Sequence, residues 1–230
     1  MPCGHLKAQE ETRRMPCGHL KAQRETRGRR RPRMGMAFMR PNLSLDATPV
    51  LRRGALLLRA PHITDHLQWA KLREASRGHL APFEPLWAED ELTRTAYRER
   101  LRRYQREARE DQGYAFFVFG DLGRTLLGGI SLTNVRRGIT QAASVGYWIG
   151  LPHTRQGHAS SALGAIVDFA FHDLRLHRME AACMPVNTPS LGVLGTAGFQ
   201  REGLARRLLR INGAWEDHVL LALVAEDLRT

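Results

Sequence analysis

The stretch that decides the fold is Gly146–Ser160, which reads GYWIGLPHTRQGHAS. Its apolar beginning is typical of a strand end, and its last residues open a helix whose apolar side chains recur at steps of three and four up to Leu174. The turn between them, with Arg155, a flexible Gly157 and free backbone N–H groups, suits a diphosphate. By itself it is equally compatible with an ordinary connection. It lacks the glycine pattern of dinucleotide folds and the Gly-Lys-Ser/Thr end of a P-loop, which weakens the nicotinamide and ATP interpretations.

Apolar runs and helical patterns alternate on both sides of this stretch. The strands we expect are Ala55–Ala60, Tyr114–Phe119, Leu126–Leu132, Ala142–Ile149, Met179–Met184, Leu208–Ile211 and Ala214–Val224, with Asn212-Gly213 as the last hairpin turn. The helices we expect start at Thr64 or Asp65, span residues 89–111, follow Gly157, and span Thr188–Ala197 before Gly198. This order predicts an α/β fold (mixed α+β), with a mixed central sheet of about seven strands flanked by about four helices on both faces.

Length and composition fit one globular domain. The chain has 230 residues, of which 43% are hydrophobic and 25% charged. We expect the domain over residues 55–227, after a leader at 1–40 and a linker at 41–54. No stretch approaches about 18 apolar residues and the leader lacks the apolar core of a signal peptide, so membrane-spanning and secreted interpretations lose support. The three cysteines are too few for a disulfide framework, which favours a reducing cytoplasm.

The leader carries most of the positive charge. The net charge of the chain is +12, and residues 1–33 hold ten Lys or Arg and three Glu, so the remainder is only mildly basic. Met1–Gln9 recurs letter for letter as Met15–Gln23, and two polar copies cannot bury a core, which predicts disorder. There are two alternatives. The repeated Cys and His could form a zinc site, although their spacing is unusual for zinc, or the leader could be an RNA-binding arm. The natural start could also lie at Met34 or just after it.

Two further motifs carry a resemblance to a known family. They are Asn187-Thr188-Pro189-Ser190 and Gly198-Phe199, which follow the loop in the expected order of elements. Together they resemble the GNAT superfamily of acetyl-CoA-dependent N-acetyltransferases over Leu56–Val224. Within it the chain is most similar to bacterial ribosomal-protein-alanine N-acetyltransferases. The segments that agree in order are His79–Pro85, Ser131–Gly138, His177-Arg178, Glu202–Arg206 and Ile211–Val219.

The resemblance implies acetyl-CoA as the co-substrate and no metal. It places acetyl-CoA in a gap between the strands at Tyr147–Gly150 and Met179–Met184. Backbone groups of Ile149 and Gly150 would hold the pantetheine arm, and Asn187 would contact it. The residues implied at the pyrophosphate are Arg155, Gln156, Gly157, His158, Ala159 and Ser160. Thr154 departs from the family pattern at its first position, from which we expect weakened affinity at most.

The resemblance also implies catalytic residues. Ser190 matches a hydroxyl near the thioester sulfur and would donate to the leaving thiolate, directly or through water; the alternative is that it only caps or solvates its short helix. Glu84 matches a glutamate of the substrate-side loop and would bind or deprotonate the amine; the alternative is a surface carboxylate. Glu180 and His177 are further candidates for the base. An α-amine has a pKa of about 8 and a thiol about 8.5, so direct transfer is chemically reasonable and Cys183 is expected to pack in the core.

The predicted function is acetyl transfer to the α-amine of a protein N-terminus, such as the N-terminal Ala of a ribosomal protein. The acceptor pocket would be built from His79–Trp87 and the hairpin at Asn212. The alternatives are a small-molecule amine, such as a polyamine or an antibiotic, and a non-catalytic acetyl-CoA-binding or RNA-associated module. We expect a cytoplasmic enzyme without membrane contact that meets nucleic acid only through the ribosome or the leader; its oligomeric state stays open.

Overall fold

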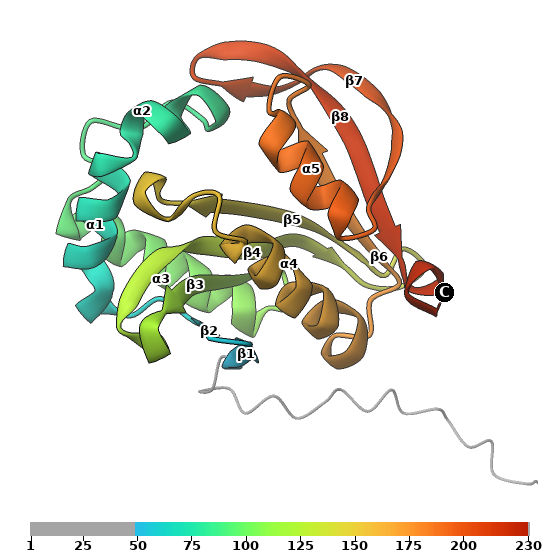
Figure 1. The fold of residues 1–230 in the computed structure, drawn as a ribbon, viewed down its shortest axis with the longest axis horizontal. Coiled ribbons are helices and arrows are strands. Elements are labelled where there is room, and N and C mark those ends of the chain that lie inside the picture. The colour runs from blue at the N-terminus through green and yellow to red at the C-terminus, as the bar shows by residue number, and fades with distance from the viewer. Residues whose placement is uncertain (1–48, 230) are drawn as a thin grey trace, which may run out of the picture. The chain divides into compact units, whose positions relative to one another are not determined.

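The structure, a computed structural model, describes residues 49–229. These residues form an eight-stranded sheet in the order β1-β2-β3-β4-β5-β6-β8-β7 (Figure 1). The strands are β1 (Leu51–Arg53), β2 (Leu56–Arg59), β3 (Tyr114–Gly120), β4 (Thr125–Arg136), β5 (Ala142–Ile149), β6 (Arg178–Cys183), β7 (Gln200–Ile211) and β8 (Ala214–Val224). Neighbouring strands are antiparallel except β5 and β6, which are parallel. The predicted mixed sheet is confirmed.

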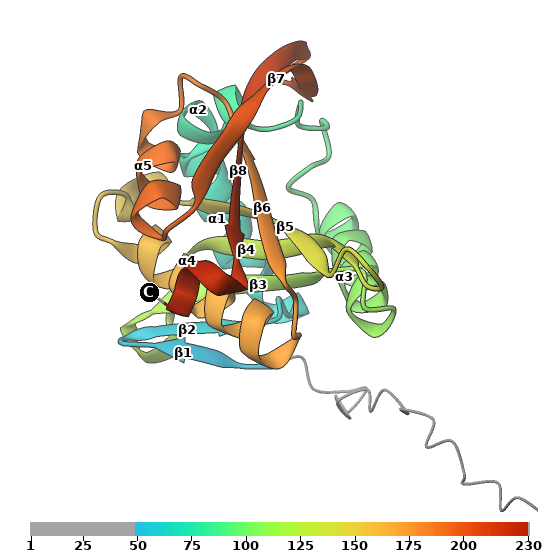
Figure 2. The ribbon, with the colours of Figure 1, turned by 90° about the vertical axis from the view of Figure 1, so that its right-hand side faces the viewer.

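Helices cover both faces of this sheet. They are α1 (His66–Ala75), α2 (Arg77–Leu80), α3 (Arg94–Arg109), α4 (His158–Asp168) and α5 (Thr188–Thr196). One core cluster joins α4 to the sheet through side chains such as Leu163 and Ile166. A second cluster joins α1 and α3 to the sheet through Trp69 and Tyr97. We call the two sides the α4 face and the α1 face; Figure 2 shows α4 and α3 on opposite sides of the strands.

Strand β3 shows how both faces are covered. Its sequence, YAFFVFG, is an unbroken apolar run, as expected for a strand that is buried on both faces. Phe116 belongs to the cluster on the α4 face, and Phe117 and Phe119 belong to the cluster on the α1 face. Burying a Phe side chain stabilises a fold by about 1.5–3 kcal/mol relative to leaving it exposed. β3 therefore anchors both helical layers.

Two short elements go beyond the prediction. The sheet has eight strands rather than seven because β1, inside the predicted linker, pairs with β2 across a turn at Gly54, where φ is +56°. The four residues of α2 add a fifth helix. Both elements are too short to show a periodicity in the sequence. The predicted helix at 89–111 begins only at Arg94, where Thr93 Oγ1 accepts a 3.2 Å hydrogen bond from the N–H of Ala96. The predicted leader lies outside the described residues.

Strands β5 and β6 diverge along their length. They pair over three residues only, Ala142–Ser144 against Arg178–Glu180. Beyond these residues β5 pairs with β4 alone, and β6 pairs with β8. The sheet therefore opens into a V between Val145–Ile149 and Ala181–Cys183. This is the gap that the resemblance implied.

Candidate active site

The V between β5 and β6 carries different side chains on the two faces of the sheet, because successive residues of a strand alternate. Tyr147 packs against the core cluster of the α4 face, and Trp148 packs against that of the α1 face. The predicted cofactor loop leads into α4, and the predicted acceptor segment follows α1 and α2. The predicted cofactor and acceptor segments thus belong to opposite faces of the opening.

The start of α4 offers unpaired backbone donors. Gly157 is the N-cap residue, with φ +76°, and no side chain caps the helix. The N–H groups of His158, Ala159 and Ser160 donate to no other residue within 49–229. A Cβ at Gly157 would meet no atom within 4 Å, so the backbone conformation requires the glycine and the space beside it is open. Free donors and the helix dipole together favour an anion here.

Other residues of this loop have local partners. The Thr154 hydroxyl donates to the carbonyl oxygen of Leu151 (3.0 Å), and the Gln156 amide donates to the carbonyl oxygen of Pro152 (3.2 Å). Thr154, which departs from the family pattern, therefore stabilises the turn. Arg155 is exposed and has φ +58°. Its guanidinium can reach a phosphate held at the helix start.

Gly150 shapes the end of β5. Its N–H donates to the carbonyl oxygen of Leu127 (2.8 Å), and its own carbonyl accepts from the N–H of His153 (2.8 Å). A Cβ at this position would lie 2.3 Å from Cδ1 of Leu72, so any other residue would force the Leu72 side chain of α1 to move. The implied contact of Gly150 with a pantetheine arm therefore has no free N–H to use. The Gly150 carbonyl oxygen keeps a second lone pair, so the contacts implied for Ile149 and Gly150 both stay predictions.

Ser190 lies against a tyrosine that the sequence analysis did not single out. Oγ of Ser190 is 2.8 Å from the hydroxyl oxygen of Tyr147, which also donates to the carbonyl oxygen of Ser190 (3.2 Å). Burial raises the pKa of Tyr147 to about 12, so it stays protonated at neutral pH. The cap of α5 is Asn187, whose Oδ1 accepts from the N–H of Ser190 (3.2 Å). The Ser190 hydroxyl is therefore not the helix cap. Strand alternation along β5 is the signal that could have found Tyr147.

Cys183 ends β6 on the same face. Its thiol is buried, with Sγ 3.6 Å from the carbonyl oxygen of Met184 and 3.7 Å from that of Asn187. Burial raises the pKa of Cys183, an effect that a hydrogen bond with Ser190 partly offsets. A protonated, buried thiol is a poor nucleophile. The arrangement agrees with the expected packing role.

Glu84 lies on the α1 face in an ion pair with a buried arginine. Arg73 donates two hydrogen bonds to the carboxylate, 2.7 Å to Oε1 and 2.6 Å to Oε2, and Trp87 Nε1 donates a third to Oε2 (2.8 Å). The guanidinium lies 4.1 Å from the ring centroid of Trp87 and 5.0 Å from that of Trp148. Glu84 therefore anchors a wall of the acceptor side, and its role as the base stays a prediction.

The two segments predicted to build the acceptor pocket meet in the structure. The N–H of Asn212, at the tip of the β7–β8 hairpin, donates a 2.9 Å hydrogen bond to the carbonyl oxygen of Glu84. Asn212 and Gly213 both have positive φ, 44° and 88°, as the predicted hairpin turn requires. The hairpin and the Glu84 loop thus form adjoining walls on the α1 face.

The other two candidate bases are also engaged. Glu180 forms ion pairs with Arg136 and with Arg178, the latter at 3.0 Å. His177 lies before β6, at the paired end of the two strands, and its Nε2 is 3.1 Å from Glu226. Neither residue offers a free group at the open end of the V.

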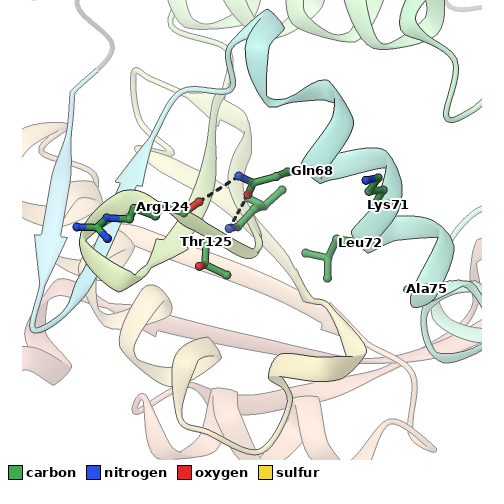
Figure 3. A pocket seen from close by; sticks show the side chains of 7 residues that line it. Gln68, Lys71, Leu72, Ala75, Arg124 and Thr125 are labelled. Carbon is green, nitrogen blue, oxygen red and sulfur yellow. Dashed lines mark hydrogen bonds between the residues drawn. The ribbon is translucent and has the colours of Figure 1, made fainter.

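A separate hollow of about 380 Å³ lies between α1 and the β3–β4 turn. Figure 3 shows Gln68 reaching across it: its amide donates to the carbonyl oxygen of Arg124 (3.0 Å) and accepts from the N–H of Leu126 (2.9 Å). The hollow contains none of the predicted site residues. Leu72, which lines it, also packs on Gly150.

Within residues 49–229, no three His, Cys, Asp or Glu side chains lie where they could hold a metal ion. None of the helices in this range is long and apolar enough to cross a membrane. The repeated Cys and His of the leader lie outside the described residues.

Comparison with known proteins gives a consistent result. The sequence profile of the family described as acetyltransferase (GNAT) domain matches residues 55–200. The protein named "Probable N-acetyltransferase YjcK" of Bacillus subtilis is 36% identical over 178 residues, which are 77% of this chain and 98% of that protein. The ribosomal protein uS5-alanine N-acetyltransferase of Escherichia coli is 31% identical over 172 residues, 75% of this chain and 89% of that protein.

A solved structure is similar in both sequence and fold. The structure of Mycobacterium smegmatis RimJ in complex with CoA-disulfide superposes with a TM-score of 0.74 at 35% identity. The match covers 81% of this chain and 91% of that one.

Proposed function

This chain belongs to the acetyltransferase (GNAT) domain family, and we propose that it transfers the acetyl group of acetyl-CoA to the α-amine of a protein N-terminus, such as the N-terminal Ala of a ribosomal protein. The observation that carries the proposal is the V between β5 and β6, with free donors and Ser190 on one face and the Glu84 wall on the other. A relative named for acetylating ribosomal protein uS5 supports this acceptor class.

The α4 face has the chemistry to hold acetyl-CoA. The free N–H groups of residues 158–160 and the Arg155 side chain would hold the diphosphate. Asn187 uses Oδ1 to cap α5, which leaves its NH2 group for the cofactor arm. Acetyl-CoA supplies an acetyl group that is activated as a thioester. The residues of this face therefore fit the co-substrate that the family uses.

We propose that Ser190 protonates the leaving thiolate and that Tyr147 orients it. When Tyr147 donates to Oγ of Ser190, the serine proton is free to point into the opening. When Tyr147 donates to the serine carbonyl oxygen, the serine proton is instead directed at the tyrosine. Because Tyr147 stays protonated, it can hold Ser190 in the first arrangement during the reaction.

The β7–β8 hairpin presents side chains suited to contact with a protein. Arg201, Arg206, Arg207 and Arg210 are exposed, and none of the salt bridges among residues 49–229 uses them. Arginine is enriched at protein interfaces. The same hairpin exposes Trp215, with 61% of its surface accessible, and apolar aromatic side chains are typical of protein-contacting surfaces.

The proposed acceptor also bears on location and partners. An enzyme that modifies ribosomal proteins would act in the cytoplasm and would meet nucleic acid only through the ribosome or through its own basic leader. The relative that acetylates ribosomal protein uS5 supports this proposal.

A thiol-release assay with acetyl-CoA tests the proposed function. Peptides with free N-terminal Ala, Ser or Met are compared with N-blocked peptides, Lys side-chain peptides and polyamines. We expect turnover only with free Ala or Ser termini. Turnover with polyamines alone would assign the small-molecule alternative, and saturable acetyl-CoA binding without any turnover would assign the non-catalytic module.

A further inference from the structure

The proposed reaction needs a group on the α1 face that can accept a proton, and the carboxylates on this face are engaged in ion pairs. An α-amine with a pKa of about 8 is mostly protonated at neutral pH and must lose a proton before it attacks. Glu84 is held by Arg73 and Trp87, and Glu180 is held by Arg136 and Arg178. Both carboxylates are thus already engaged with cationic side chains rather than free to meet the amine.

Strand pairing places His218 on the α1 face. Directly paired residues of neighbouring strands project to the same side of a sheet. Ser144 pairs with Glu180, which pairs with Ala222. Alternation along β5 adds Trp148 to this side, and alternation along β8 adds His218. His218 therefore projects to the same side as the Trp148 ring that packs beside Arg73.

His218 also lies level with the open end of the V. The last pair between β6 and β8 joins Cys183 to Val219, so His218 is the next residue of β8, just beyond the end of β6. The chain that leaves β6 at this level leads directly to Asn187 and Ser190. His218 and Ser190 thus flank the same opening, on the α1 face and the α4 face respectively.

The ring of His218 has one nitrogen that is ready to accept a proton. Nδ1 lies 3.0 Å from the carbonyl oxygen of Glu216, and because a carbonyl only accepts, Nδ1 carries the hydrogen. In the neutral ring Nε2 is then the acceptor, and it has no hydrogen-bond partner in the described part of the chain. His218 is only 3% exposed. Among residues 49–229, the side-chain nitrogens and oxygens that are completely buried without a partner are Nε of Arg73 and Nε of Arg100, so Nε2 of His218 is not sealed in this way.

We propose that His218 is a catalytic residue whose Nε2 accepts a proton from the acceptor α-ammonium. This inference rests on the proposed function. The neutral amine then attacks the thioester carbonyl carbon, the C–N bond forms and the C–S bond breaks. Of the three ammonium protons, the amide keeps one, one passes to His218 and then to solvent, and one balances the proton that Ser190 gives to the thiolate.

Few other ionisable groups share this side of the sheet. Glu216 is the next residue of β8 on the same side, opposite Leu209 of β7. Glu180 of β6 is neutralised by Arg136 and Arg178, and Glu84 of the acceptor loop by Arg73. Ala205 stands directly opposite His218 on β7. The β7 residue directly opposite His218 is therefore uncharged, and Arg206 and Arg207 follow it on β7.

The test compares the full-length wild type with His218→Gln, and with His172→Gln as a matched control on an exposed histidine that follows the C-terminal end of α4. Turnover of an Ala-terminal peptide is measured at pH 7 and pH 9.5, together with acetyl-CoA affinity. We expect His218→Gln to lose roughly 10- to 100-fold in kcat at pH 7 and less than about threefold at pH 9.5, where the amine is already neutral. The control should match the wild type at both pH values.

Unchanged kcat at pH 7, or an equal loss at both pH values, would overturn the proposal. If His218→Gln loses acetyl-CoA affinity through misfolding, the wild type itself provides the test. Its kcat/KM is then followed against pH with Ala-terminal and with less basic 3-fluoroalanine-terminal peptides. If the profile shows one pKa that is the same for both peptides and a second that shifts with the basicity of the amine, a base on the protein is supported. A single pKa that moves with the amine contradicts the proposal. Absence of wild-type turnover with every peptide would instead remove the proposed function.

Discussion

The hydroxyl oxygen of Tyr147 lies 2.8 Å from Oγ of Ser190, a contact that joins the wall of the opening on β5 to the start of α5. Tyr147 lies on β5, the strand that lines the V, whereas Ser190 lies on α5, which comes after α4 and β6 in the chain. Because burial raises the pKa of Tyr147 to about 12, the phenol keeps its proton at neutral pH and can donate it either to Oγ or to the carbonyl oxygen of Ser190. Substitution of Tyr147 or Ser190 should therefore affect the rate of acetyl transfer and the affinity for acetyl-CoA differently.

Removing either hydroxyl should slow transfer more than it weakens binding. We expect Ser190→Ala to lower kcat roughly 10- to 100-fold, and Tyr147→Phe to lower it several-fold, because a general acid typically contributes at least that much. The acetyl-CoA dissociation constant should stay within about twofold in both variants. Steady-state kinetics with an equilibrium binding measurement separate the two effects. Full turnover in Ser190→Ala would remove Ser190 from the mechanism.

A negative charge at the start of α4 should abolish cofactor binding. Gly157→Glu adds strain at φ +76° and places a carboxylate where the diphosphate is expected. The matched control is Gly138→Glu, because Gly138 also has positive φ (+67°) and open space around its Cα but lies in the β4–β5 turn. Calorimetric titration with acetyl-CoA should show no binding in the first variant and normal binding in the second. Retained affinity for acetyl-CoA in Gly157→Glu would show that the start of α4 does not bind the diphosphate.

Glu84→Gln should destabilise the protein, since it leaves Arg73 buried without a carboxylate. Removal of one partner of a buried ion pair costs about 3–5 kcal/mol, and the partial exposure of Glu84 reduces this to about 2 kcal/mol. If Glu84 positions the acceptor wall, turnover should fall by the same factor at pH 7 and pH 9.5. Recovery of turnover at pH 9.5 would instead identify Glu84 as the base.

The packing of α1 on the end of β5 should be sensitive to one methyl group. Gly150→Ala would place a Cβ 2.3 Å from Cδ1 of Leu72, so we expect the free energy of unfolding to fall by about 1–3 kcal/mol. Gly195→Ala in α5 is the control, since its Cβ would meet nothing within 4 Å and alanine favours a helix. Urea unfolding measures both. Equal stabilities of the two variants would show that α1 moves freely away from β5.

The Cys183 thiol should react slowly near neutral pH. Burial raises its pKa, and only the thiolate is alkylated, so the reactive fraction at pH 8 is smaller than for a free cysteine of pKa about 8.5. Iodoacetamide labelling should therefore rise with pH beyond the point where a free cysteine levels off. Peptide mass spectrometry separates Cys183 from Cys3 and Cys17. Labelling of Cys183 at pH 8 as fast as that of a cysteine peptide would show an exposed or activated thiol.

The order of elements could be predicted because it depends on local signals. The strand at Ala142–Ile149, the helix that follows Gly157 and the turn at Asn212 all appear where periodicity and turn residues indicate them. β1 and α2 were not predictable, since three or four residues show no period. The candidate site was only partly predictable: motif positions located Ser190 and Gly157, and strand alternation along β5 could have indicated Tyr147, but His218 became a candidate only through the pairing of β8 with β6.

The sequence by itself determined the order of strands and helices, where α4 begins and that its first N–H groups are free, because these follow from chain-local geometry. Only the tertiary structure decided which polar groups are already occupied. Arg73 reaches Glu84, Leu127 takes the N–H of Gly150, and Tyr147 meets Ser190. The members of such pairs come from different elements, so each pairing depends on how α1, β4, β5 and α5 pack. Because of that packing, the Glu84 carboxylate is held by Arg73, and Nε2 of His218 on β8 is left as the proposed proton acceptor.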